Sequence, residues 1–110
     1  MTTNMKISSK MRERILRNFM DLIILKELRN KANISGYDII TLFHRKFRML
    51  LSAGSVYSVL YALERKGLIE GIMTNEKRVY KLTKKGEEEI QKVLHNRDNI
   101  QFFMQSMFSK

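Results

Sequence analysis

The sequence predicts a mostly helical α+β fold in which a short helix leads into a two-stranded hairpin. Three features of residues 51–82 support this prediction. A segment with helical apolar spacing begins at Ser52 and ends at Gly67, a residue suited to a left-handed helix stop. An apolar run at 68–73, a charged turn and an alternating run at 78–82 follow without a gap. This order is typical of a winged helix-turn-helix, in which a helix and a basic hairpin act together.

Length and composition predict one compact domain. A chain of 110 residues with 44% apolar residues is large enough for one core. We expect residues 1–83 to form the winged helix-turn-helix region with its N-terminal helix, and residues 84–110 to form a C-terminal dimerisation helix. No run of 18 apolar residues and no secretory signal occurs, so a cytoplasmic protein without a membrane span is expected. Because cysteine is absent, disulfides and thiolate metal sites are excluded.

The charge of +10 is unevenly distributed along the chain. Lys and Arg outnumber Asp and Glu by eight to three in residues 1–31 and by five to one in residues 72–85. Two separate basic segments predict a polyanionic partner. A basic, solvated surface without a partner is the alternative.

The first helix is expected to run from about Ser9 to Asn30. Its second half is apolar nearly all round, which indicates burial on more than one side. We expect it to form the core and, through Phe19 and Ile23, part of a dimer contact; a helix buried only within its own domain is the alternative. The apolar residues that recur at helical spacing are Ile15, Phe19, Leu22, Ile23 and Leu25.

Two further helices are expected to form the helix-turn-helix. Ser35 precedes a helix from Gly36 to about Phe47, and Ser52 precedes the next, so each serine is expected to act as an N-cap. Only a few residues join the two helices, as a helix-turn-helix requires. The third helix directs an apolar stripe inward, formed by Val56, Val59, Leu60 and Leu63.

The last helix is expected from Lys84 to about Phe108, capped by Thr83. Its apolar residues repeat in alternating steps of three and four, the spacing of a coiled-coil seam. A helix of this length, about 37 Å, overhangs a small domain, so we expect a homodimer. A helix folded back on its own domain is the alternative. The expected dimer residues are Phe19, Ile23, Ile90, Val93, Leu94, Ile100, Phe103, Met104 and Met107, with Arg97 as a charged interruption of the seam.

No pattern in the sequence predicts catalysis or a cofactor. His44 and His95 are far apart and have no ligands at metal-binding spacing, so no metal site is expected. The acidic run 87–89 suits the opening turns of a helix better than an acid–base pair. The five glycines form no phosphate-binding loop.

Double-stranded DNA is therefore the expected partner. The third helix is expected to enter the major groove with hydroxyls and its free N-terminal amides, and the hairpin tip is expected to reach the minor groove or its flanking phosphates. For Tyr57, packing against the second helix is an equal alternative. The expected DNA-binding residues are Ser52, Gly54, Ser55, Tyr57, Ser58, Tyr61, Arg65, Lys77 and Arg78.

Four segments resemble the winged-helix regulators of the PadR family. They are 22–28 (LIILKEL), 35–39 (SGYDI), 54–69 beginning GSVY, and 78–86 ending LTKKG. The resemblance implies a homodimeric transcriptional repressor that binds a palindromic operator. It assigns the tyrosine of the recognition helix to Tyr57 and the basic wing to Lys77 and Arg78. The single helix after the wing resembles the short subfamily.

The chain departs from this family at two points. Family members often have proline where this chain has Ala53 and Ser58. Some short members bind flat aromatic drugs between subunits through a tryptophan, which this chain lacks. If a small-molecule effector binds, the candidates for its pocket wall are Phe19, Ile23, Phe102 and Phe103; a plain dimer core is the alternative for these residues. Two other classes stay open: an architectural DNA-binding protein with little sequence preference, and a winged-helix module that binds proteins.

Overall fold

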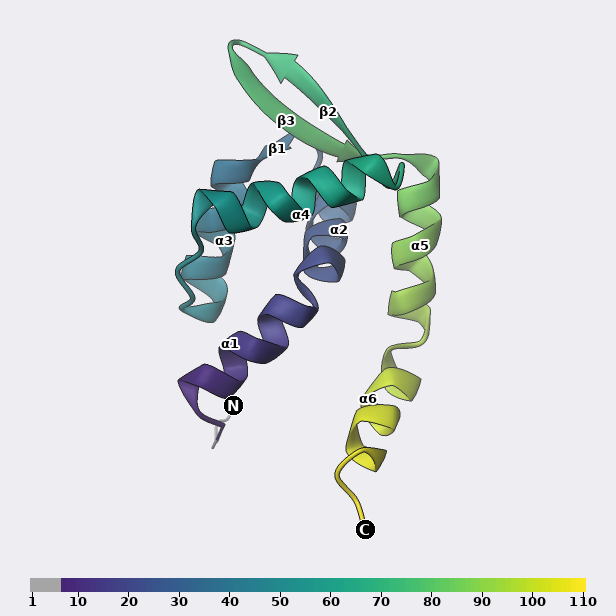
Figure 1. The fold of residues 1–110 in the computed structure, drawn as a ribbon. Coiled ribbons are helices and arrows are strands. Elements are labelled where there is room, and N and C mark those ends of the chain that lie inside the picture. Colours follow the sequence, from purple (N-terminus) through teal and green to yellow (C-terminus); the bar gives the residue numbers. More distant parts are fainter. Residues whose placement is uncertain (1–6) are drawn as a thin grey trace.

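The computed structural model describes residues 7–110 and has the predicted mostly helical winged helix-turn-helix architecture (Figure 1). A hairpin lies at one end of the molecule, and the first and last helices extend toward the other end. In chain order the elements are α1 (Ser9–Asn18), α2 (Met20–Asn30), β1 (Ile34–Ser35), α3 (Gly36–Phe47), α4 (Ala53–Arg65), β2 (Ile69–Thr74), β3 (Lys77–Leu82), α5 (Lys84–His95) and α6 (Arg97–Ser106).

The core packs against the inner face of α4. Apolar side chains from α2, α3, α4 and α5 meet there and are withdrawn from water, which supplies most of the driving force for folding. The predicted inward stripe of α4 is confirmed, although Val59 is only half-buried. The opposite face of α4 is left free. The largest side chains less than 2% exposed are Phe43, Ile24, Leu25, Ile39, Leu60, Leu63, Ile90 and Val56.

The wing is the predicted hairpin, extended by a short third strand. β2 and β3 pair antiparallel from Ile69↔Leu82 to Thr74↔Lys77. Asn75 and Glu76 both have positive φ, 48° and 63°, as a two-residue hairpin turn requires. β1 pairs with β3, so β3 is the central strand. The sequence predicted no strand before α3, because a two-residue strand is too short to show an alternating pattern.

The expected first helix is interrupted at Phe19. The prediction of one helix to Asn30 was wrong in this respect, because Phe19 leaves helical geometry with φ −112° and ψ 13°. The side-chain amide of Asn18 donates to the carbonyl of Arg14 at 3.2 Å. Such bonds compete with the backbone ladder and favour a break. α1 therefore leaves the core in its own direction.

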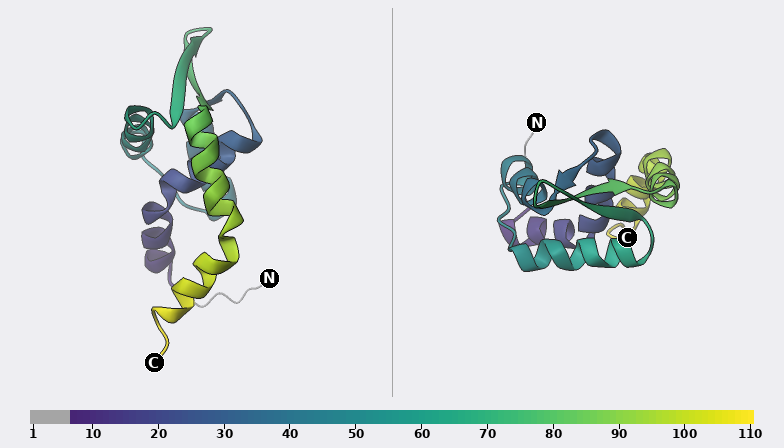
Figure 2. Two further views of the ribbon diagram at one scale, coloured as in Figure 1. Left: turned by 90° about the vertical axis from the view of Figure 1, so that its right-hand side faces the viewer. Right: turned by 90° about the horizontal axis from the view of Figure 1, so that it is seen from above.

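The last helix is also interrupted, at Asn96. The single helix of about 37 Å expected from the sequence is instead two helices, α5 and α6, separated by this residue. The Asn96 side-chain amide donates to the carbonyl of Lys92 at 2.8 Å, the same competition as at Asn18. Because α6 begins directly after the break, it continues past the domain at an angle to α5 (Figure 2).

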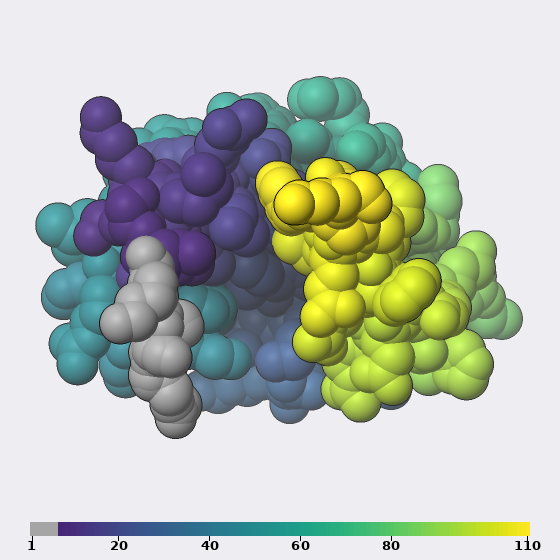
Figure 3. All heavy atoms as spheres, turned by 90° about the horizontal axis from the view of Figure 1, so that it is seen from below, coloured from purple at the N-terminus to yellow at the C-terminus, as the bar shows by residue number. Residues whose placement is uncertain are grey.

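α1 and α6 form an open end opposite the wing. Seen from this end, the two helices stand apart with a hollow between them (Figure 3). Neither helix contains a buried residue. The molecule thus has a packed half that carries α4 and the wing, and a loosely covered half made by its first and last helices.

The N-cap of α3 provides a test of local stability. Ser35 Oγ accepts from Asp38 N at 3.1 Å, and Asp38 Oδ2 accepts from Ser35 N at 2.9 Å. The backbone N–H of Ser35 donates to the Asp38 carboxylate, and this bond lowers the pKa of Asp38. The stability that the bond contributes is therefore present above the ordinary carboxyl pKa, and it is lost as pH falls through the lowered pKa of the folded state. Ser35→Ala is expected to lower the free energy of unfolding at pH 7 by about 1 kcal/mol in urea denaturation. Ser58→Ala, at an exposed helical position, is the control and should change it by less than about 0.5 kcal/mol.

Candidate nucleic-acid interface

The outward face of α4 has a polar N-terminus. Ser52 Oγ accepts from Ser55 N at 3.1 Å, which confirms the predicted N-cap. The Ser55 hydroxyl lies 3.0 Å from that of Ser52 and is half-buried. The other α4 residues expected to contact DNA are exposed: Gly54, Tyr57, Ser58, Tyr61 and Arg65.

Tyr57 packs against α3, the first helix of the helix-turn-helix, while keeping an exposed edge. A Cβ atom at Gly36, the first residue of α3, would lie 2.6 Å from the Tyr57 hydroxyl oxygen. The ring therefore occupies the space that a side chain at position 36 would need. Because Tyr57 is still 42% exposed, packing and an outward contact coexist at this residue.

The wing runs alongside α4 when the molecule is seen from above (Figure 2). Lys77, at the first position of β3, is exposed near the hairpin tip. The neighbouring Arg78 is already paired: its Nη2 lies 2.7 Å from Oε2 of Glu64 in α4. Of the two wing cations expected to contact phosphates, Lys77 is exposed, and Arg78 pairs with Glu64 of α4.

A cleft of about 450 Å³ lies between α4 and the wing. At the edge of this cleft, the Arg78 guanidinium lies 5.7 Å from the centre of the Tyr80 ring. Burial raises the pKa of the Tyr80 hydroxyl, so it is neutral at physiological pH. The residues that line the cleft are Tyr57, Tyr61, Glu64, Arg78 and Tyr80. Glu64 was not identified as a functional residue from the sequence. The signal that could have identified it is its carboxylate, which lies on a helix expected to approach phosphates.

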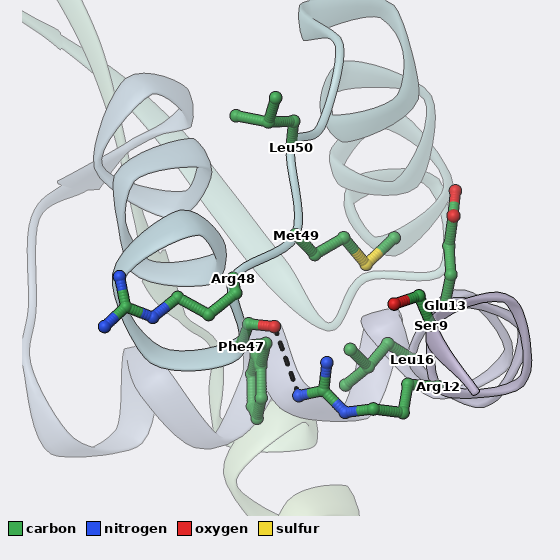
Figure 4. Close-up of a pocket in the computed structure, with 8 residues that line it drawn as sticks. All are labelled: Ser9, Arg12, Glu13, Leu16, Phe47, Arg48, Met49 and Leu50. Carbon is green, nitrogen blue, oxygen red and sulfur yellow. Dashed lines mark hydrogen bonds between the residues drawn. The ribbon is translucent and has the colours of Figure 1, made fainter. Parts of the chain in front are cut away.

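A second pocket, of about 260 Å³, lies between α1 and the turn of the helix-turn-helix (Figure 4). Arg12 Nη2 donates to the carbonyl oxygen of Phe47, at the end of α3, at 3.2 Å. A cation at this position satisfies a carbonyl that the helix leaves unpaired. Arg12, counted among the basic N-terminal residues, thus ties α1 to the turn before α4.

The residues expected in a dimer seam divide at Asn96. Ile90 is 1% exposed and belongs to the core of its own domain. Val93 and Leu94 pack partly against that core. Beyond the break, Phe103 and Met107 are 64% and 54% exposed. The remaining members are half-buried (Ile23, Ile100 and Met104) or 36% exposed (Phe19).

The described residues were also searched for metal-binding groups and membrane spans. Among residues 7–110, no three His, Cys, Asp or Glu side chains come together to hold a metal ion. In the same part of the chain, no helix is long and apolar enough to cross a membrane.

The sequence pattern of the transcriptional regulator PadR-like family matches residues 24–92, which span the core, α4 and the wing. The chain belongs to the PadR-like family. This is a family of transcriptional regulators, which agrees with the prediction that the chain is not an enzyme. No curated protein sequence matched the chain.

Solved structures of transcriptional regulators, PadR-family proteins among them, share the fold. A transcriptional regulator from Clostridium thermocellum is 21% identical, with a TM-score of 0.74 over 94% of this chain and 99% of that one. A PadR family regulator from Clostridium difficile is 24% identical, with a TM-score of 0.72 over 83% of this chain and 99% of that one. Bacillus subtilis PadR, solved in complex with operator DNA, is 29% identical with a TM-score of 0.59. That match covers 68% of this chain and 46% of the Bacillus subtilis protein.

Proposed function

We propose that this PadR-like regulator acts in the cytoplasm as a homodimer that binds a palindromic operator and represses transcription by blocking access to the promoter. The observation that carries the proposal is the outer face of α4, which is held rigidly by the core and lies free beside a wing with an exposed lysine at its tip. Membership of a family of transcriptional regulators supports it, as does the operator complex of Bacillus subtilis PadR.

In this proposal α4 enters the major groove. The N-terminus of α4 presents backbone amides and the hydroxyl of Ser52 to a phosphate. Further along, hydroxyls and one guanidinium reach base edges or backbone. Lys77 contacts phosphates from the wing, and Arg78 has the separate role argued below. The α4 residues of the proposed interface are Ser52, Gly54, Ser55, Tyr57, Ser58, Tyr61 and Arg65.

The dimer in this proposal forms at the open end of the molecule. An isolated helix as short as α6, with ten residues and none buried, is marginal in water. Its apolar side chains gain from contact with a second copy, because 64% of Phe103 and 71% of Phe102 are otherwise exposed. A two-fold axis there would place the two α4 helices in successive major grooves, about 34 Å apart.

Lys77→Ala tests the wing. The variant is expected to weaken binding to operator and to random DNA by the same factor, because a phosphate contact carries no sequence information. It should also reduce the slope of log affinity against log salt by about 1. Fluorescence anisotropy titrations over a range of salt measure both quantities. Lys92→Ala, which removes an exposed cation from α5, is the control; an equal loss of slope there would remove the wing from the proposed interface.

Recovery of bound genomic fragments tests the proposed regulator as a whole. A regulator should enrich a palindromic motif near promoters and protect it against excess random DNA. Enrichment without a motif would favour an architectural protein, which shares the basic surface. Absence of a shift on any DNA at low salt would favour a protein-binding module and would exclude the proposed function.

A further inference from the structure

One carboxylate joins the recognition helix to both strands of the wing. Oε2 of Glu64 accepts from Arg78 Nη2 at 2.7 Å and from the backbone N–H of Gly71 at 3.3 Å. Gly71 lies on β2, two rungs from the Ile69↔Leu82 pair at the base of the hairpin, and Arg78 lies on β3, four rungs from that pair. Glu64 is thus bonded to both strands at once, and its side chain is only 26% exposed.

The sequence around this contact leaves room for the arginine. A Cβ atom at Gly71 would lie 2.7 Å from Cζ of Arg78, so only glycine accommodates the guanidinium without a shift. On its other side the guanidinium approaches the Tyr80 ring, which is 3% exposed and therefore held in place. A carboxylate, a glycine backbone and an aromatic ring thus contact the Arg78 guanidinium, although 43% of the Arg78 side chain stays exposed.

The wing needs such a contact because its outer part has little other support. The third strand, β1, pairs only with Val79 and Tyr80. The remaining rungs toward the turn, ending at Thr74↔Lys77, form a two-stranded ribbon, which is marginal in water. The pair Glu64–Arg78 reaches this ribbon from α4, across the cleft between them.

We propose that Glu64 is a positioning residue for DNA recognition, which sets the wing relative to α4 by holding Arg78 and the Gly71 amide. This rests on the proposed function. Lys77 then meets the DNA backbone at a defined distance from the bases read by α4. Arg78 acts through Glu64 and makes no phosphate contact of its own, since its charge is neutralised within the domain.

Hydrogen exchange of the wing amides tests the clamp without DNA. In Glu64→Ala and in Arg78→Ala, exchange at residues 72–79 is expected to be about three- to tenfold faster, the range set by one exposed ion pair plus one hydrogen bond. The double variant should exchange no faster than Glu64→Ala, because Glu64→Ala already removes the ion pair that Arg78→Ala breaks. Glu70→Ala, which removes an exposed carboxylate from the same hairpin, should leave exchange unchanged. Unchanged exchange in Glu64→Ala would overturn the proposal.

DNA titrations test the consequence for recognition. In Glu64→Ala the ratio of operator to random-DNA affinity is expected to fall about three- to tenfold, whereas Glu70→Ala, with the same change in charge, keeps the ratio. Arg78→Ala should lower this ratio too, with the salt slope unchanged, in contrast to Lys77→Ala. A slope reduced by about 1 in Arg78→Ala, or an unchanged ratio in Glu64→Ala, would overturn the positioning role. A wild-type protein that binds no DNA would refute the proposed function, and the exchange experiment would still decide whether the clamp exists.

Discussion

Phe103→Glu combined with Met107→Glu is expected to convert the proposed dimer into a folded monomer and to lower operator affinity by about 10²- to 10⁴-fold. Phe103 lies in α6 and Met107, four positions later, is the C-cap residue of α6; they are 64% and 54% exposed in the single chain. Charge at these sites therefore costs the monomer little, but it would be buried without a partner in a dimer seam. The loss of affinity follows because two linked recognition helices bind far more tightly than one.

Light scattering and operator titration together measure this effect. Gln101→Glu with Gln105→Glu adds the same charge to exposed polar positions of α6 and should leave both mass and affinity unchanged. A dimer that survives the change at Phe103 and Met107 would contradict the role of α6. A monomer that keeps full operator affinity would contradict the need for two recognition helices.

Gly86→Ala is expected to lower the free energy of unfolding by about 3 kcal/mol, which is at the upper end for overpacking. Gly86 is buried in the first turn of α5, and a Cβ atom there would overlap the carbonyl oxygen of Leu68. This oxygen also accepts from Thr83 N at 3.1 Å, so it cannot move without breaking the entry to α5. The clash is with backbone, and relief requires α5 to shift away from the core.

Urea denaturation of Gly86→Ala beside Gly54→Ala gives a matched comparison. A Cβ at Gly54 would have only Ser52 Oγ near it, at 3.9 Å, and the site is helical. Alanine there should therefore stabilise the protein by about 0.5–1 kcal/mol. Two identical substitutions are thus expected to have opposite signs. Equal effects would show that helix propensity, and not the approach to Leu68, governs position 86.

Local chemistry made much of this fold predictable. Ser35, Ser52 and Thr83 cap helices through bonds that span three residues, and these bonds depend on little outside that span. Gly67 and Asn75 adopt the positive φ that their residue types tolerate. The inward stripe of α4 followed from helical spacing, and the short wing from alternation. The outward residues of the proposed interface were predictable for the same reason, as the complement of the buried stripe.

The breaks in the first and last helices were not predictable from the same patterns. Apolar spacing continues through Phe19 and Asn96, so it indicated unbroken helices. Asparagine beside or at each break donates to a carbonyl four residues earlier, and the sequence does not show whether that bond or the helical ladder prevails. The break at Asn96 also decides which half of the predicted seam stays in the core and which half is exposed.

By itself, the sequence determined the order of the elements, their caps and the basic wing, because these depend on residues a few positions apart. Only the tertiary structure decided that Arg78 pairs with Glu64, fourteen positions away in sequence, whereas Lys77 is exposed. It also decided that Tyr57 rests on Gly36 and that α5 approaches Leu68 closely enough to require Gly86. Each of these contacts joins segments that are distant in sequence. Periodicity and capping patterns do not show how far apart such segments lie in the folded chain.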